Sequence, residues 1–299
     1  MSEKKISISF GVLQRRHGPK EALEICARAG FDAVDFDLDS YGLPNDPIYK
    51  KSDEEIVEYF KDIKKRADEL GIAIGQTHGK CKAYVPDDDA YNQWVYQTSR
   101  RDLLATAALG APACVIHSIM QLRWGKQTPE FLHAKNKEFF DDLIPFAEEY
   151  GTAVALETFG DTCPNGVRTC EFFGDVHELK KQYDMLDTKN KALCMDTGHS
   201  HHCAKHGMTD TVEAIYYLNK DITLLHLNDN NGYSDQHLPP LLAGSESGLN
   251  WKEVMKALDD IEYKGFYNFE ISLYPYGKML EDTIYYLGKY LRKFVDGTL

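Results

Sequence analysis

The sequence predicts a single (β/α)8 barrel, the TIM barrel fold, with residues 1–299 as one domain. Eight short apolar segments alternate with eight longer segments whose apolar residues recur at helical spacing. Glycines that would end the helices precede the strands about every 40 residues, which indicates an internal repeat of βα units. Eight such units in 299 residues are typical of a closed barrel, whereas an open sheet would leave its edge strands exposed. No GxGxxG motif follows the first strand, which argues further against an open dinucleotide-binding sheet.

The expected strands are short runs rich in Val, Ile, Leu and Phe, a composition typical of parallel strands that are buried on both faces. They cover residues 5–10, 33–38, 72–78, 113–118, 153–159, 192–198, 222–229 and 267–272. The expected helices show amphipathic spacing, as in the series Ile56, Tyr59, Phe60, Ile63 and Ala67. The glycines expected to end helices are Gly30, Gly71, Gly110 and Gly151. Longer loops follow the strands and are expected on the catalytic rim, at residues 39–52, 79–90, 119–129, 160–174 and 230–250.

Acidic residues outnumber basic ones: 47 Asp and Glu face 34 Lys and Arg, which gives a formal net charge of -13 and a pI near 5.3. A net negative charge disfavours binding to the negatively charged phosphodiester backbone, so we do not expect nucleic acid as a partner. The N-terminus lacks the pattern of a signal peptide, and no run approaches the roughly 20 apolar residues of a membrane span. We therefore expect a cytoplasmic protein with no membrane contact. The seven cysteines are scattered without a CxxC pair, so reduced thiols are expected.

Ionisable side chains stand at the C-terminal ends of six expected strands. They are His78, His117, Glu157, Asp196, His226 and Glu270, and His199 lies just beyond Asp196. Because parallel strands of a barrel end at one rim, these groups are expected to converge. Carboxylates buried in apolar strands such as VALETF and YNFEIS cost several kcal/mol each unless they are paired or metal-bound, and those strands carry no Lys or Arg. A divalent cation is the simplest explanation, and such ligands suit Mn²⁺, Mg²⁺, Co²⁺, Fe²⁺ or Zn²⁺.

The segments ALETFG, CMDTGHS, LLHLND and NFEIS resemble the metal-binding strands of the xylose isomerase-like barrel superfamily. That superfamily holds sugar and sugar-phosphate isomerases, ketose 3-epimerases and the apurinic-site endonucleases of AP endonuclease family 2. The resemblance implies a primary metal site formed by Glu157, Asp196, His226 and Glu270. It also implies that Glu157 and Glu270 act from opposite faces of the substrate, one removing a proton and the other delivering it, around a metal-stabilised cis-enediolate.

Five further residues bear on the number of metal ions. Together with the four primary residues, they reproduce the ligand types of the trinuclear zinc endonucleases of the superfamily: His78, His117, His199, Asp235 and His237. They could instead bind substrate hydroxyls around one metal ion. We favour one divalent ion, with up to three as the alternative.

The stretch HLNDNNGYSDQHLPP also resembles a pattern of bacterial sugar-phosphate isomerase/epimerase homologues, which continues with Gly-Glu-Gly before a Trp. Here serines flank Glu246, so this side chain is expected to orient or solvate rather than to ligate. On the loop after the fourth strand, Trp124 could stack on a sugar face and Arg123 could meet a carboxylate or phosphate, as could Arg168 after the fifth strand. No Gly-rich phosphate cradle is visible, so the sequence leaves phosphorylation of the substrate open.

Several other polar residues have a simpler interpretation as solvated. The run after the first strand is expected on the solvated rim, and consists of Arg15, Arg16 and His17. The histidines past the sixth strand are expected in a solvated loop, and are His201, His202 and His206. Aromatic residues of the last helix suit either a homo-oligomer interface or core packing: Tyr285, Tyr286 and Tyr290.

The resemblance implies a divalent-metal-dependent isomerase or epimerase of a small sugar or sugar phosphate, or an inosose dehydratase-like lyase that uses the same enolate chemistry. An alternative from another class is a trinuclear-zinc apurinic-site endonuclease, which nine matching positions favour and the net charge of -13 opposes. A third alternative is a non-catalytic barrel that binds a sugar or a partner protein and keeps the metal as a structural staple. The presence of all four primary ligands disfavours it.

Overall fold

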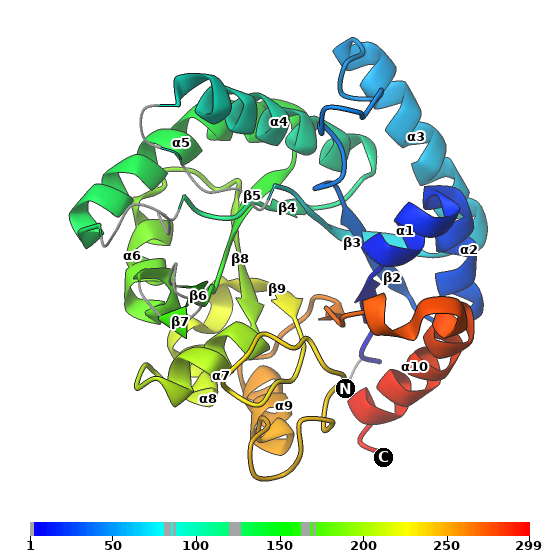
Figure 1. The fold of residues 1–299 in the computed structure, drawn as a ribbon, viewed down its shortest axis with the longest axis vertical. Coiled ribbons are helices and arrows are strands. Elements are labelled where there is room, and N and C mark those ends of the chain that lie inside the picture. Colours follow the sequence, from blue (N-terminus) through cyan, green and yellow to red (C-terminus); the bar gives the residue numbers. More distant parts are fainter. Residues whose placement is uncertain (1–2, 81–84, 86–87, 120–126, 163–167, 170–171) are drawn as a thin grey trace.

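Eight parallel strands form a barrel with helices around it, which confirms the predicted fold (Figure 1). The structure is a computed structural model that describes residues 3–80, 85, 88–119, 127–162, 168–169 and 172–299. Around the barrel the strands follow the order β10-β1-β2-β3-β4-β5-β8-β9. Their bounds are β1 (Ile6–Ser9), β2 (Ala33–Asp37), β3 (Ala73–His78), β4 (Ala113–Val115), β5 (Ala153–Glu157), β8 (Lys191–Asp196), β9 (Ile222–His226) and β10 (Tyr267–Phe269).

All eight predicted strands are present, and each is shorter than its predicted range. The largest differences lie at the mouth of the barrel, where β4 ends at Val115, β9 at His226 and β10 at Phe269. His117 and Glu270 therefore follow their strands rather than belonging to them. A small antiparallel pair inserted after β5 was not predicted, and consists of β6 (Asp161–Thr162) and β7 (Arg168–Thr169).

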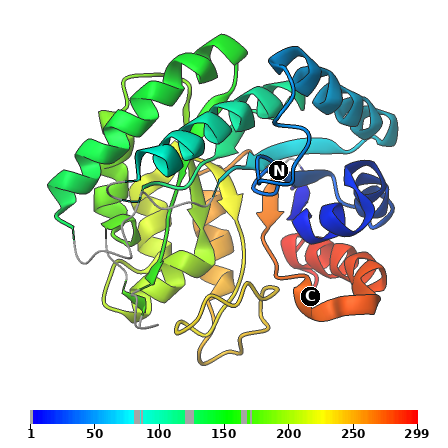
Figure 2. The same cartoon turned by 45° about the horizontal axis from the view of Figure 1, so that its top comes forward.

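Helices connect successive strands, and α3, α4 and α5 lie side by side along one flank of the barrel (Figure 1 and Figure 2). The α-helices are α1 (Gly11–His17), α2 (Pro19–Arg28), α3 (Asp53–Leu70), α4 (Asp89–Ala108), α5 (Pro129–Tyr150), α6 (Val176–Met185), α7 (Thr197–Lys205), α8 (Thr211–Leu218), α9 (Trp251–Asp260) and α10 (Leu280–Val295). Three 3-10 helices accompany them in the described residues: η1 (Phe172–Gly174), η2 (Asn219–Asp221) and η3 (Tyr274–Met279).

The ends of α3 show how the sequence sets these helices. Ser52 and Glu55 form a reciprocal capping box at its N-terminus. Gly71 ends the helix with a φ of 68°, a left-handed conformation that glycine adopts without strain. Gly151 ends α5 in the same way, with a φ of 74°.

The interior of the barrel divides into an apolar half and a polar half. Alternation along β5 places Ala155 on the same face as Glu157, and this face belongs to a small apolar cluster formed by Ala113, Val115, Ala155, Ala192, Cys194 and Leu224. On the opposite side, β1, β2, β3 and β10 bury the polar side chains of Ser7, Asp35, Gln76 and Asn268. Outward-facing residues such as Ile8 and Phe36 pack in the main core beneath the helices. The polar half therefore lies beside the site described below.

The barrel closes at a seam between β9 and β10. This seam has one bridge, between Leu227 and Phe269, just beyond β9. Two backbone hydrogen bonds cross it, from the Leu227 amide to the Asn268 carbonyl at 2.8 Å and from the Glu270 amide to the Leu227 carbonyl at 3.1 Å. His226 and Glu270 lie immediately beside this seam.

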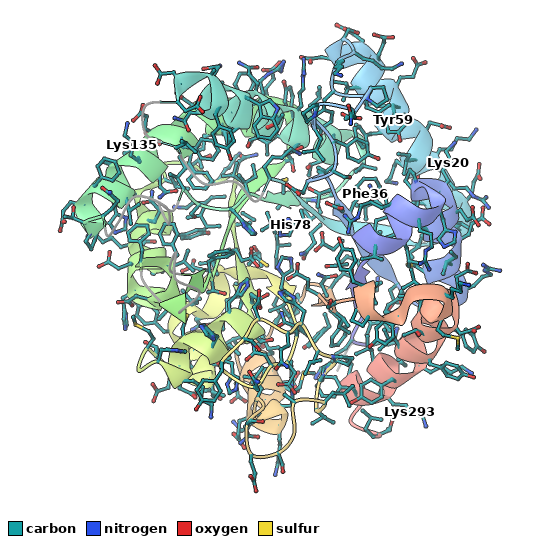
Figure 3. The ribbon with its side chains drawn as sticks, viewed as in Figure 1. Lys20, Phe36, Tyr59, His78, Lys135 and Lys293 are labelled. Atoms are coloured by element: carbon teal, nitrogen blue, oxygen red, sulfur yellow. The ribbon has the colours of Figure 1, made fainter. Side chains whose placement is uncertain are left out.

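Polar and aromatic residues also mark the outside of the molecule. Figure 3 shows Lys20, Lys135 and Lys293 at the periphery and His78 toward the middle of the ring of strands. Tyr285 and Tyr286 are exposed, whereas Tyr290 is partly buried, and its hydroxyl donates to the Pro240 carbonyl at 2.5 Å. Among the described helices, none combines the length and the apolar character needed to cross a bilayer.

Candidate active site

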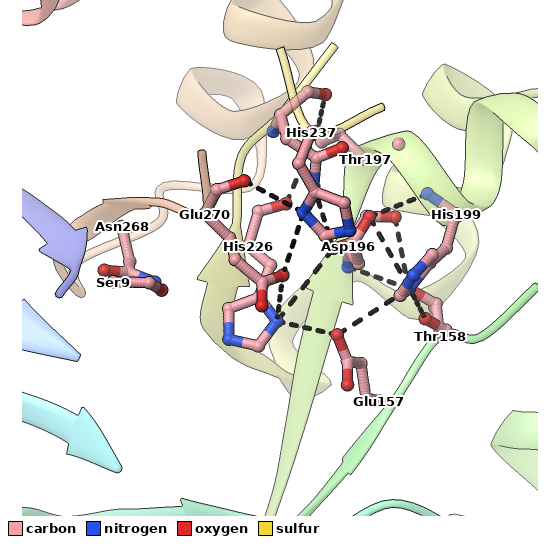
Figure 4. Close-up of polar contacts among 12 residues, drawn as sticks. Ser9, Glu157, Thr158, Asp196, Thr197, His199, His226, His237, Asn268 and Glu270 are labelled. Carbon is pink, nitrogen blue, oxygen red and sulfur yellow. Dashed lines mark hydrogen bonds and ion pairs between the residues drawn. The ribbon is translucent and has the colours of Figure 1, made fainter. Parts of the chain in front are cut away.

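Four residues from consecutive barrel strands meet at the mouth (Figure 4). Glu157 ends β5, Asp196 ends β8, His226 ends β9, and Glu270 follows β10; one ligand atom from each lies within 4.8 Å of the others. Nδ1 of His226 lies 2.6 Å from Oε1 of Glu157, 3.4 Å from Oε2 of Glu270 and 4.0 Å from Oδ2 of Asp196. The neighbouring ends of successive parallel strands bring these side chains together.

Among the described residues, imidazoles are the groups that compensate the charges of these carboxylates. In the described part of the chain, no Lys or Arg nitrogen lies within 4.0 Å of the carboxylates of Glu157, Asp196 or Glu270. Burial alone would raise the pKa of Glu157, but His226 and His117 hold that pKa well below its usual range. Burial raises the pKa of Asp196 to about 6. Three carboxylates and one imidazole in a shielded site form a donor set that fits a divalent cation.

Asp196 also fixes the helix that follows it. As the N-cap of α7, its Oδ1 accepts a hydrogen bond from the His199 amide at 2.7 Å. Its Oδ2 accepts from Nδ2 of Asn228 at 2.9 Å. Because α7 begins directly after β8, the His199 ring is buried above the strand ends, where its Nδ1 lies 3.7 Å from Oε1 of Glu157.

A second group of possible ligands consists of His199, Asp235 and His237. Asp235 lies between the two imidazoles, with Oδ2 at 3.6 Å from Nε2 of His199 and Oδ1 at 3.0 Å from Nε2 of His237. The other ring nitrogen of His237 contacts the Glu270 carbonyl at 3.0 Å, which joins this group to the first. Burial works against a charged His237, but Glu270 and Asp235 raise the pKa of that imidazole to about 10.

A third group shares Glu157 and His226 with the first group and adds His78. Nε2 of His117 lies 2.9 Å from Oε2 of Glu157 and 3.2 Å from Nε2 of His78. The structure thus brings together all nine residues that the sequence marks as possible ligands: His78, His117, Glu157, Asp196, His199, His226, Asp235, His237 and Glu270. Glu157 and His226 are the members common to two of the groups.

The structure does not place the four candidate substrate-binding residues in the ligand groups. Glu246 is exposed in the loop between β9 and α9. Arg123 and Trp124 lie outside the described residues; Arg168 belongs to β7, but its side chain also lies outside them.

The expectation of a solvated loop past β8 is wrong for two histidines. His201 and His202 are buried because α7 starts at once after β8 and presses both rings inward, while His206 at the end of the helix is exposed as expected. Arg15 is exposed on the rim as expected. It also pairs with Asp37, and its Nη2 donates to the Tyr274 hydroxyl at 2.6 Å.

An open cleft of about 290 Å³ reaches the site. Its lining includes His78, His237 and Glu270 from the ligand groups and Arg15, Asp37 and Tyr274 from the rim. Of the described residues that line it, Arg15 is the one Lys or Arg. A small substrate could therefore contact the ligand groups and the Arg15–Asp37 pair at the same time.

Sequence reasoning missed Asp35. This aspartate is buried on β2, lines the same cleft, and its Oδ2 lies 3.2 Å from Nε2 of His226. Asp35 carries the same signal that marked Glu157, a carboxylate inside an apolar strand, but it lies before the C-terminal end of β2. Sequence reasoning also missed Asn228, which contacts Asp196.

Comparisons with known proteins agree with this architecture. The barrel superposes on a D-tagatose 3-epimerase-like protein (TM-score 0.71, 19% identity, 98% of both chains), on L-ribulose 3-epimerase (TM-score 0.71, 15% identity, 99% of this chain and 95% of the other) and on the IolI protein with a bound zinc atom (TM-score 0.70, 16% identity, 99% of both chains). At these identities the likeness concerns the fold.

Sequence comparison finds a curated relative in Methanocaldococcus jannaschii, the uncharacterized protein MJ1311. The two are 29% identical over 150 residues, and the match spans 49% of this chain and 46% of that protein, about half of each. The family model described as xylose isomerase-like TIM barrel matches residues 23–289, and the chain therefore belongs to this family.

Proposed function

We propose that the protein is a divalent-metal-dependent isomerase or epimerase of a small sugar, acting by proton transfer at the carbon next to the carbonyl. One observation carries the proposal. Glu157, Asp196, His226 and Glu270 place ligand atoms within 4.8 Å of one another beside an open cleft, without a Lys or Arg among the described residues to neutralise them. The epimerases among the structural neighbours support the same class of reaction.

In this proposal Glu157, Asp196, Glu270 and Nδ1 of His226 would hold the cation. A divalent cation bound there supplies Lewis-acid polarisation of the substrate carbonyl and helps to orient the substrate. Glu157 and Glu270 approach from different sides of the barrel mouth, and burial would raise the pKa of each, but nearby imidazoles lower both. Both are therefore ionised. In the proposed reaction one of them takes the proton from the carbon next to the carbonyl, and the other, after taking up a proton from solvent, delivers it to that carbon. The first then releases its proton to solvent, so that both return to the ionised state.

The cleft favours an uncharged sugar over a phosphorylated one. The positive charge of Arg15 is already matched by Asp37. Asp35, Asp37 and Glu270 outnumber Arg15 and the protonated His237 among the described charged residues of the lining, so a phosphate dianion would face more carboxylates than cationic side chains there. An uncharged polyol can donate hydroxyl protons to Asp37, accept from Arg15 and pack its carbons on the exposed ring of Tyr274.

The test is proton exchange at carbon. The protein, loaded in turn with Mn²⁺, Mg²⁺, Co²⁺, Fe²⁺ and Zn²⁺, is incubated in D₂O with a broad panel of ketoses and aldoses, and deuterium is followed by NMR. We expect deuterium next to the carbonyl of at least one sugar, with Glu157→Gln and Glu270→Gln inactive. Glu58→Gln, a change at an exposed glutamate of α3, serves as the matched control and should keep the activity. Failure of every sugar with every metal would refute the proposal, and loss of water from the substrate would identify a lyase instead.

A second candidate function is phosphodiester cleavage by three zinc ions. It is favoured by the three ligand groups, two of which share Glu157. Elemental analysis of the purified protein separates the two candidates. About one metal per chain supports the isomerase or epimerase, whereas three zincs together with salt-sensitive cleavage of an abasic duplex would support the phosphodiesterase.

A further inference from the structure

A buried carboxylate that the proposed reaction does not use lies next to the metal-ligand group. Asp35 of β2 is 1% exposed, and its Oδ2 lies 3.2 Å from Nε2 of His226. The other ring nitrogen of His226, Nδ1, lies 2.6 Å from Oε1 of Glu157. The His226 ring thus bridges Asp35 on one side and the candidate metal ligands on the other.

Three further donors from other strands converge on the same oxygen atom. Oδ2 of Asp35 accepts from Oγ of Ser9 at 2.9 Å, from Nε2 of Gln76 at 3.2 Å and from Nδ2 of Asn268 at 3.2 Å. The amide of Asn268 is oriented by Ser7, whose Oγ donates to Oδ1 of Asn268 at 2.8 Å, so the NH₂ group must face Asp35. These contacts hold the Asp35 carboxylate in place as an acceptor.

An acceptor at this position determines which nitrogen of His226 carries the proton. Nε2–H donates to Asp35, so a neutral His226 ring has its lone pair on Nδ1, toward Glu157 and Glu270. The ring is also held by its neighbour His78, which stacks on it at 5.4 Å between centroids and 18° between planes. An imidazole fixed in orientation and tautomer by a carboxylate is a stronger metal ligand than a free one.

We propose that Asp35 is a positioning residue that orients His226 as a metal ligand and raises its affinity for a divalent cation. The role rests on the metal site of the proposed function. Loss of a partner of this kind typically lowers metal affinity by about 10- to 100-fold. A purely structural role for Asp35 would affect folding but would leave the affinity and geometry of the metal site unchanged.

A matched control exists for that structural role. Asp102 is also buried, and its Oδ1 contacts Nζ of Lys80 at 3.1 Å and the Tyr49 hydroxyl at 2.7 Å. None of these three residues belongs to a ligand group. Asp102→Asn therefore removes a buried carboxylate without touching His226.

The experiment titrates the metal-free protein with Co²⁺ and records its visible absorption spectrum. We expect Asp35→Asn to bind Co²⁺ about 10- to 100-fold more weakly with an altered spectrum, and Asp35→Ala to bind at least as weakly. Asp102→Asn should keep the wild-type affinity and spectrum, even if its melting temperature falls. Affinity and spectrum equal to wild type in Asp35→Asn would overturn the role of Asp35 alone. Absence of Co²⁺ binding by the wild type would overturn the proposed function with it.

A measurement on the wild-type protein covers the case in which Asp35→Asn does not fold. In zinc-loaded protein labelled with ¹⁵N-histidine, Nε2 of His226 should carry a proton and Nδ1 should show the shift of a metal-bound nitrogen. The reverse pattern, with zinc on Nε2, would contradict the proposed role of Asp35.

Discussion

Asp196 and His199 are joined by a hydrogen bond of 2.7 Å from the backbone amide of His199 to Oδ1 of Asp196. A candidate metal ligand is therefore also the N-cap of α7. The two roles use different oxygens, because Oδ2 is the atom that lies 4.0 Å from Nδ1 of His226. The Asp196 carboxylate therefore lies at the barrel mouth and also holds His199 there.

Two substitutions separate these roles. Asn caps helices about as well as Asp, so Asp196→Asn should keep the cap and lose the charged ligand, whereas Asp196→Ala should lose both. We expect both variants to lose metal binding. Urea unfolding of the metal-free proteins should place Asp196→Ala about 0.5–2 kcal/mol below Asp196→Asn. Equal stability of the two would show that the cap contributes nothing.

Gly198 leaves room for the amide that supports Asp196. A Cβ at Gly198 would lie 1.8 Å from Oδ1 of Asn228, whose Nδ2 donates to Asp196. Alanine would favour α7 by about 1 kcal/mol, but displacing Asn228 should cost about 1–3 kcal/mol and weaken metal binding. Gly160→Ala is the matched control, because its Cβ would meet its nearest neighbour at an ordinary 3.5 Å. Wild-type stability and metal affinity in Gly198→Ala would contradict this account.

Metal binding should release protons. Burial opposes a charge on His226, but Glu270 and Glu157 raise its pKa well above the usual range. His226 therefore carries an extra proton in the metal-free protein at neutral pH. A metal ion needs the neutral ring, so the apparent affinity should rise with pH. Calorimetric titration in buffers of different ionisation enthalpy measures the protons released, and an affinity constant between about pH 6 and 8 would refute the prediction.

The stability of the metal-free protein should fall as the pH rises, whereas its metal affinity should increase. The pKa of His237 is raised to about 10 from the usual 6.5. A raised imidazole pKa stabilises the folded protein fully below about pH 6.5, and this contribution is lost as the pH rises toward about 10. Urea unfolding across this range should show the loss, and His237→Gln should flatten it.

Asp37 is expected to decide between uncharged and phosphorylated sugars. Asp37→Asn removes the charge that matches Arg15, which would then be available to a phosphate. We expect the KM for an uncharged sugar to rise by about tenfold, since a hydrogen bond to a charged group contributes about 1.5–3 kcal/mol, and binding of the sugar phosphate to improve. Adding Arg15→Gln should abolish the gain. Unchanged preference in Asp37→Asn would remove Arg15 and Asp37 from substrate recognition.

Much of the fold and the centre of the site follow from local patterns. The eight strands are predictable because parallel strands buried on both faces are apolar runs, and Glu157 and His226 stand out at the ends of such runs. The lengths of β4 and β10 were overestimated, because apolar residues continue past the point where each backbone loses its neighbour at the barrel mouth.

Other features depend on contacts between distant segments. Asp35 meets His226 across 191 residues of sequence, and no pattern on β2 alone identifies that partner. Arg15 acquires its position in the cleft from Asp37 on β2 and from Tyr274 near the end of the chain. His202 is buried because of where α7 packs, which the hydrophilic sequence around it does not indicate.

The seam between β9 and β10 affects where the barrel opens locally. It has one bridge, and His226 and Glu270 stand on its two sides. A cation bound by both residues would link β9 to β10 at the place where the barrel has the fewest strand–strand bridges. Native-state hydrogen exchange should then show the amides of Leu227 and Glu270 opening readily in the stripped protein and becoming slow once the ion is added, while amides between β2 and β3 change little.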